Sequence, residues 1–353
     1  MSVVSRGCRR LTHWLKSFVL LLVLVSRVAD AQDTVTGLND GLSRRLAVLG
    51  GRVSRDSTAD GRGVIVDLAG AEVTDRDLES IAEIPGLTHL DVSSSLVSDA
   101  GLAHLAGATR LESLVLTRTR VSDGGLTHLQ KKTGLKRLAV GFTRVQGPGL
   151  GGLSGLEVLQ LNGAQVTDRS LAHLAGYSQL KRLDLSLSRV TDNGLKQLAP
   201  LTSLSSLSLC GTLVGDPGLA HLVALKSLSR LELSGSQAGD AGMQHVGQLS
   251  SLVALSLDRT RVGDTGVARL LGLGSLQSLG LAATRVSDEA ARHLAEFPAL
   301  ERLSLASTRL TDRGLQDLYQ AEKLRSLTLT LTPTTRTGVL GLKNAIAGLA
   351  VER

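Results

Sequence analysis

Leucine recurs in a fixed frame from residue 87 almost to the C-terminus. It opens successive units at positions 87, 111, 135, 156, 180, 204, 228, 252, 276, 300 and 324. Every step is 24 residues except one of 21, between Leu135 and Leu156. A constant period of this length is typical of a stacked repeat solenoid. Function must therefore be sought on the surfaces of a repeat.

One unit, 87–110, reads LTHLDVSSSLVSDAGLAHLAGATR. Numbered from its opening leucine, each unit is apolar at positions 1, 4 and 6, and the alternation over positions 3 to 7 predicts a strand with one buried face. Ser or Thr stands at position 9 in most units, Asp at position 13, Gly at 15, and apolar residues, mostly Leu, at 16 and 19. Asp, or the Ser/Thr before it, suits a helix N-cap, and the apolar pair gives a short helix an inner face.

No such unit can bury its apolar face alone, so the units must stack on one another. The sequence predicts an α/β solenoid in the form of a right-handed arc, with one parallel sheet, a continuous leucine core and short helices on the convex side. We expect the hydroxyl at position 9 to bond backbone groups of the adjacent coil. The 21-residue unit loses its residues from the helix side.

The pattern L-x-x-L-x-L-x-x-T-x-V-T-D-x-G-L-x-x-L resembles leucine-rich repeats of the cysteine-containing, F-box-associated type. It is closer to the versions found in exported bacterial proteins of planctomycete-like genomes. The resemblance covers about residues 63–342 and implies a curved solenoid used for binding. It implies no particular partner and no catalytic residues.

The first 31 residues have the pattern of a secretory signal peptide. A basic segment with Arg6, Arg9, Arg10 and Lys16 precedes the apolar run 18–25, and Ala29-Asp30-Ala31 provides a cleavage site. The run is too short for an ordinary membrane span. We therefore expect export to the periplasm or the medium, with no stable membrane span after cleavage; anchoring by an uncleaved N-terminal segment is the alternative.

The period predicts four segments: a signal peptide at 1–31, an N-terminal cap at 32–62, about twelve repeats at 63–336 and a C-terminal cap at 337–353. The N-terminal cap is expected to contain a helix at about 38–49 and a short strand at 52–55. A final helix at 337–350 and an edge strand at 351–352 are expected to close the other end.

Charge and cysteine content narrow the class of function. The full chain carries +7, but residues 1–31 hold five basic residues and one aspartate, a net +4, which leaves about +3 afterwards. Nucleic acid is therefore not an expected partner. After cleavage only Cys210 remains, so no disulfide framework is expected.

Two patterns imitate enzyme sites. Residues 147–152 satisfy G-x-G-x-x-G, but each glycine also fits the repeat frame, so a dinucleotide site is not favoured. Six histidines share position 18 and are interpreted as partly buried spacers rather than a metal ladder: His104, His128, His173, His221, His245 and His293. We predict no catalytic residues, no cofactor and no metal.

The one feature that the repeat does not require is arginine at position 10. It recurs in six units, and Arg259 precedes one of them by two residues; the stripe comprises Arg120, Arg144, Arg189, Arg261, Arg285 and Arg309. One interpretation is a solvated edge balanced by the aspartates at position 13. The other is a docking strip for an acidic protein or an anionic envelope polymer.

The open sheet face, at positions 3, 5, 7 and 8, is expected to be small, polar and self-neutralising, with Arg182 beside Asp184 and Arg230 beside Glu232. The sequence thus favours an exported, non-enzymatic protein-binding or scaffold protein. Two alternatives stay open: a substrate receptor of a ubiquitin-ligase (F-box type) complex, suggested only by repeat resemblance, and an envelope protein that binds an anionic polymer.

Overall fold

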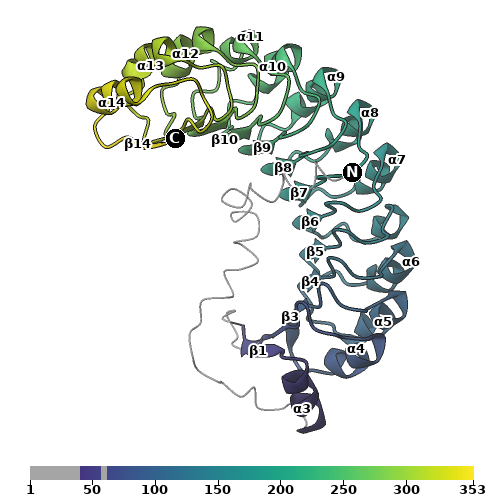
Figure 1. The fold of residues 1–353 in the computed structure, drawn as a ribbon. Coiled ribbons are helices and arrows are strands. Elements are labelled where there is room, and N and C mark those ends of the chain that lie inside the picture. Colours follow the sequence, from purple (N-terminus) through teal and green to yellow (C-terminus); the bar gives the residue numbers. More distant parts are fainter. Residues whose placement is uncertain (1–39, 57–61) are drawn as a thin grey trace.

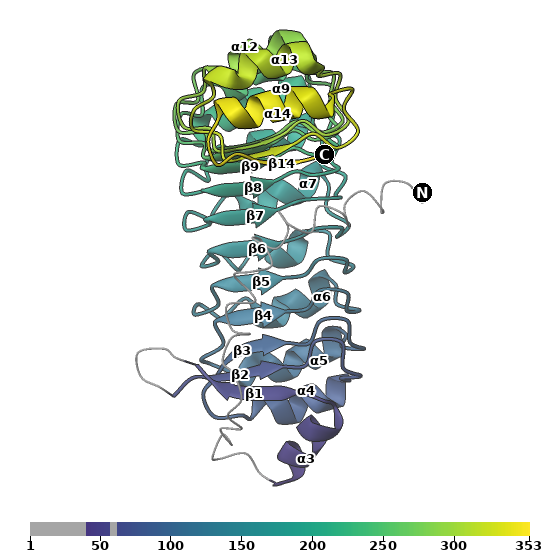
Figure 2. The ribbon, with the colours of Figure 1, turned by 60° about the vertical axis from the view of Figure 1, so that its left-hand side comes forward.

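The computed structural model describes residues 40–56 and 62–353, which form one curved stack of coils (Figure 1). The predicted signal peptide and residues 32–39 and 57–61 of the predicted N-terminal cap lie outside the described residues. A 14-stranded sheet runs in sequence order along the concave side, and the helices cover the convex side (Figures 1 and 2). All neighbouring strands pair in parallel except β1 and β2, which are antiparallel.

The strands are short because only positions 3 to 5 pair in most coils. Their bounds are β1 Arg52–Arg55, β2 Val64–Asp67, β3 Leu87–Asp91, β4 Ser113–Val115, β5 Arg137–Ala139, β6 Val158–Gln160, β7 Arg182–Asp184, β8 Ser206–Ser208, β9 Arg230–Glu232, β10 Ala254–Ser256, β11 Ser278–Gly280, β12 Arg302–Ser304, β13 Ser326–Thr328 and β14 Ala350–Glu352.

The convex side carries one helical segment per coil. The α-helices are α3 Asp40–Val48, α4 Asp75–Ala82, α5 Asp99–His104, α6 Asp123–Leu126, α7 Asp168–Leu171, α8 Asp192–Leu195, α9 Asp216–Leu219, α10 Asp240–Val246, α11 Asp264–Ala268, α12 Asp288–Ala295, α13 Asp312–Asp317 and α14 Arg336–Ala345. Many are continued or replaced by a 3₁₀ turn: η2 Leu105–Gly107, η3 Thr127–Leu129, η4 Pro148–Leu150, η5 Ala172–Leu174, η6 Lys196–Leu198, η7 Ala220–Ala224 and η8 Leu318–Gln320.

The leucine frame forms a single continuous core between the sheet and the helices. In the coil that starts at residue 180, all five predicted core leucines are fully buried: Leu180, Leu183, Leu185, Leu195 and Leu198. Each buried leucine contributes roughly 1.5–3 kcal/mol relative to exposure, and apolar residues occupy the same positions in the following coils. The predicted fold class is confirmed.

A tight turn follows each strand. The N–H of position 9 donates to the carbonyl of position 6, as from Thr119 to Leu116 at 3.2 Å, and the backbone at position 8 is left-handed in every coil, from Gly70 to Leu331. A positive φ at the third residue identifies a type II turn. The Thr119 hydroxyl donates to the same Leu116 carbonyl at 2.6 Å. The expectation that this hydroxyl would bond the adjacent coil was wrong, because the turn presents a nearer acceptor.

The aspartate at position 13 bonds the next coil rather than its own helix. Asp168 accepts the backbone N–H of Thr191 at 2.7 Å and the Thr191 hydroxyl at 2.6 Å. Thr191 is the N-cap of α8, and Asp192 is only its first residue. The predicted cap residue is thus the Ser/Thr, while the aspartate anchors the N-cap of the following coil. We call this series of contacts the aspartate ladder.

The ladder explains the glycine at position 15. A Cβ on Gly194 would lie 2.5 Å from Asp168 Oδ1 and 3.1 Å from Asp168 Cα. Most coils therefore have glycine there, although Ala290 shows that one methyl group can be accommodated beside Asp264. Position 15 therefore needs a small residue because the aspartate of the preceding coil fills the space beside it.

The 21-residue unit interrupts the ladder. Gly147 (φ 130°) stands where the aspartate would be, and η4 replaces the α-helix. In the next coil Ser170 replaces the glycine, and its hydroxyl accepts the N–H of Thr167 at 3.0 Å. Ser170 thus does within its own coil what an aspartate of the preceding coil does elsewhere. The buried hydroxyl of Tyr177 donates to the Leu150 carbonyl at 2.6 Å and joins the two coils.

Both ends of the core are covered. Leu42 and Leu46 of α3 are buried against the first coil. The Arg45 guanidinium donates to Asp77 at 2.7 Å and holds the pKa of that carboxyl down at about 2. At the other end α14 buries Leu342, and β14 extends the sheet beside β13. The final helix ends at Ala345, earlier than predicted.

Candidate functional site

Two surfaces of the arc are candidates: the rim formed by the turns after the strands, and the concave face of the sheet. We call the first the turn edge, which consists of positions 8 and 10 of each coil. The six position-10 arginines are all exposed, and among the described residues none of the six forms an ion pair. No ion pair joins them to the aspartates of position 13, whose carboxylates accept hydrogen bonds from the next coil, as Asp240 does from the N–H of Gly263.

Position 8 of the turn edge carries large side chains in a backbone conformation that favours glycine. Four coils use glycine there, whereas Arg118, Phe142, Leu187, Arg259 and Leu331 have φ values between 56° and 61°. A left-handed non-glycine residue costs roughly 1–2 kcal/mol. Strain of this kind is tolerated mostly at functional positions. The fold does not require these large side chains, because glycine takes the same backbone conformation in four coils.

Apolar and cationic side chains lie together on the turn edge. The Arg118 guanidinium carbon lies 5.3 Å from the centre of the Phe142 ring, and Phe142 remains 42% exposed. Leu96 and Leu213 occupy position 10 and are also exposed. Sequence reasoning found the arginines but not the contact between Arg118 and Phe142. The alternation of glycine with large residues at position 8 was the available signal.

The opposite charges of the concave face do not form the direct ion pairs that the sequence suggested. Among the described residues, no ion pair joins Arg182 to Asp184 or Arg230 to Glu232. The two residues of each pair share one face, but their charged groups do not meet. The opposite charges therefore share the face without direct contact, and Arg230 still lowers the pKa of Glu232 against the larger effect of burial.

The carboxyl groups of Asp184 and Glu232 are partly or fully buried among small polar side chains. Burial raises the pKa of Asp184, which accepts the backbone N–H of Ser186 at 2.9 Å. Burial also raises the pKa of Glu232, and the nearby Asp184 adds to the effect. Glu232 accepts a hydrogen bond from Ser208 at 3.2 Å, and Cys210 approaches it at 3.9 Å.

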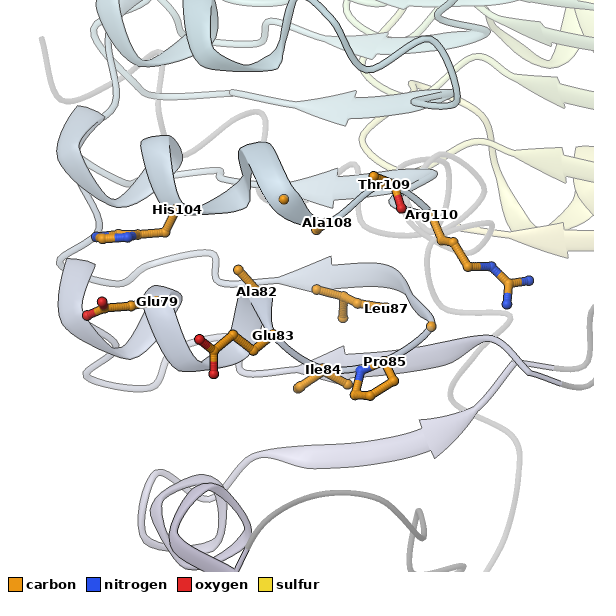
Figure 3. Close-up of a pocket in the computed structure, with 12 residues that line it drawn as sticks. Glu79, Ala82, Glu83, Ile84, Pro85, Leu87, His104, Ala108, Thr109 and Arg110 are labelled. Atoms are coloured by element: carbon orange, nitrogen blue, oxygen red, sulfur yellow. The ribbon is translucent and has the colours of Figure 1, made fainter.

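A third feature is a hollow of about 500 Å³ between the first two coils (Figure 3). Glu79, Glu83 and His104 lie toward one end, and Arg110 lies at the other. The middle is apolar, with Ile84 and the side chains beside it. Nothing in the repeat pattern predicted it.

The glycine-rich stretch that resembles a dinucleotide site has a structural role. Gly147 and Gly149 donate their N–H groups to Asp123, both at 2.9 Å, so the glycine-rich stretch serves coil packing. Within 40–56 and 62–353, no group of three or more His, Cys, Asp or Glu residues is placed to hold a metal ion. Over the same ranges, no helix is long and apolar enough to span a bilayer.

Comparison with known proteins supports the fold. Residues 179–199 match a family model described as Leucine Rich repeat. An internalin of Listeria monocytogenes is similar in structure, with a TM-score of 0.65 and 19% identity over 89% of this chain and 94% of the internalin. A leucine-rich repeat protein of Leptospira interrogans has a TM-score of 0.54 and 18% identity, over 78% of this chain and 80% of that protein. No curated protein matches. The chain thus has the open, arc-shaped solenoid fold of leucine-rich repeat proteins.

Proposed function

We propose that this chain is an exported, non-enzymatic scaffold that binds an acidic protein surface along its turn edge. The observation that carries the proposal is the set of exposed, unpaired arginines on the same rim as left-handed, partly exposed Phe142 and Leu187. Neither the core nor the ladder needs these side chains. A signal peptide at residues 1–31 would supply the export.

An acidic partner follows from the spacing of the arginines. Arg261, Arg285 and Arg309 occupy the same position of three consecutive coils, and neighbouring strands of a sheet lie about 4.8 Å apart. Like charges this close repel unless anions lie between them. The planar guanidinium fork matches carboxylates with two parallel hydrogen bonds. Carboxylates presented in a row would satisfy all three.

The apolar part of the turn edge favours a protein over an anionic polymer. Phe142 packs beneath Arg118, and Leu213 is 53% exposed one coil beyond Leu187. Protein interfaces are anchored by aromatic and arginine side chains. An envelope polymer would use the arginines but gain little from Phe142 or Leu213.

The test compares two variants with the same change in net charge. One replaces Arg261, Arg285 and Arg309 with Gln; the control replaces Arg169, Arg292 and Arg313, exposed arginines on the helix side. Binding to proteins of the exported fraction is measured at low and high salt. Three exposed charge contacts of 0.2–1 kcal/mol each predict a roughly tenfold loss for the first variant.

The parent is expected to bind protease-sensitive material, more weakly as salt rises. Binding that survives protease digestion would instead identify a polymer. If the turn-edge variant binds as tightly as the control at low salt, the arginines are only a solvated rim and the proposal is wrong.

A further inference from the structure

Four charged side chains surround two serines near the middle of the concave face. Strands β7, β8 and β9 pair in register, so that Arg182, Ser206 and Arg230 form one row and Asp184, Ser208 and Glu232 form the next. We call the four charged residues of these rows the charged frame. Figure 2 shows the three strands side by side on the open face of the sheet.

The first row is rich in donors that have no partner. Neither Arg182 nor Arg230 forms an ion pair or a side-chain hydrogen bond among the described residues. The Ser206 hydroxyl is also without a hydrogen-bond partner, although Ser206 is only 7% exposed. A buried hydroxyl without a partner costs free energy. The strand register places this hydroxyl between two arginine residues, and such a set of donors suits an oxyanion.

The second row is acidic and offers hydrogen-bond acceptors instead of donors. Asp184 and Glu232 receive hydrogen bonds from serines and approach no cation closely enough to pair. The two carboxyl groups flank Ser208, which is 2% exposed and whose hydroxyl lies 2.7 Å from that of Ser186. A cation placed above Ser208 would have a carboxylate on each side.

The distance between the rows selects the shape of the ligand. They lie at positions 3 and 5 of each strand, two residues apart on an extended backbone. In any extended peptide, alternate side chains point the same way and are separated by two rises of about 3.3 Å. A peptide strand above β8 would place one side chain over each row. The serines of β8 leave room for it, since the longer side chains stand on β7 and β9, two strand spacings apart, roughly 9.6 Å.

We propose that the charged frame binds an extended segment of a partner protein in which an acidic and a basic side chain stand two residues apart. The acidic side chain lies between Arg182 and Arg230 and accepts a third hydrogen bond from Ser206. The basic side chain lies between Asp184 and Glu232. This surface is separate from the turn edge, and the inference does not rest on the function proposed for that edge.

The first experiment measures binding of short, end-blocked, fluorescein-labelled peptides to the full chain by polarisation. Peptides of the type Thr-Glu-Thr-Lys-Thr and Thr-Lys-Thr-Glu-Thr cover both chain directions, and Thr-Gln-Thr-Gln-Thr is the neutral control. At least one of the mixed-charge peptides is expected to bind ten times more tightly than the neutral one. Equal binding of all three, or none by any, refutes the inference.

The second experiment assigns the binding to the frame. Changing Arg182 and Arg230 together to Gln is expected to weaken binding of the mixed-charge peptide at least tenfold. The matched control changes Arg137 and Arg302, which also stand at position 3 but do not flank Ser206. Ser206→Ala, a smaller change that leaves the charges in place, is expected to cost a few-fold. Thermal unfolding of each variant reports on the fold.

A reversal of preference is the decisive result. With Arg182→Glu and Arg230→Glu all four frame residues become acidic, and Thr-Lys-Thr-Lys-Thr should become the preferred peptide. A folded variant that keeps the parent's preference contradicts the inference. The turn-edge variant described above should bind the peptides normally, so that the two proposals can fail independently.

Discussion

The pairing between Asp168 and Gly194 can be tested with four proteins: the parent, Asp168→Gly, Gly194→Ser and the double variant. The double variant copies the natural arrangement of Gly147 and Ser170. Removing Asp168 leaves the N–H of Thr191 without its acceptor, which predicts a loss of about 1–3 kcal/mol in the free energy of unfolding. A serine Cβ at 194 meets Asp168 Oδ1 at 2.5 Å, and such crowding predicts a loss of about 1–3 kcal/mol.

The double variant should cost less than the sum of the two changes. Without the carboxylate, the new serine has room, and its hydroxyl can accept the N–H of Thr191 as Ser170 accepts that of Thr167. A favourable coupling of about 1–2 kcal/mol is expected, well above the roughly 0.5 kcal/mol within which independent sites add. Urea unfolding followed by circular dichroism measures it. Additive losses would show that the carboxylate and the glycine are not partners.

Three further changes test other parts of the structure. Burial raises the pKa of Asp184, so ionisation of this carboxyl group destabilises the fold as the pH rises through that pKa. Asp184→Asn should therefore raise the melting temperature at pH 7. This gain should vanish below pH 3.8, the ordinary pKa of an aspartate. Gly235→Ala should cost about 1 kcal/mol in urea unfolding, since φ is 69° while the nearest atom lies 3.8 Å from the new Cβ; no loss would remove the strain argument. Arg45→Gln should lower stability at neutral pH, and its melting temperature should converge on the parent's as pH falls from 4 toward 2, where Asp77 becomes protonated.

The architecture was predictable because it depends on a pattern that repeats. Leu183 and its equivalents recur at a constant interval, so the strand, its inner face and the stacking of coils follow from the frame. The helix caps were predicted less well. The sequence places Asp192 next to a helix start but does not show that its carboxylate reaches Gly215 in the next coil, at 2.7 Å.

The candidate surfaces were predictable only in part. The arginines of the turn edge stood out because the repeat tolerates Leu96 and Leu213 in the same position. Phenylalanine usually avoids a left-handed backbone, so the conformation of Phe142 was recognisable only from the glycines at the same position of other coils. Arg182 and Asp184 were expected to pair because they are close in sequence, but Asp184 is buried and no ion pair joins the two. Such contacts depend on side-chain burial, which a single chain pattern does not encode.

The aspartate ladder determines how the length of this protein can be edited. Most coils present a carboxylate on one side and a small residue on the other, so deleting a 24-residue unit between two such coils rejoins the same two surfaces. Deleting the 21-residue unit, residues 135–155, instead brings Asp123 against Ser170. That shortened chain should need Ser170→Gly to fold well. A unit can thus be removed wherever the carboxylate of one coil meets a glycine of the next. Removal of the 21-residue unit also requires the change Ser170→Gly.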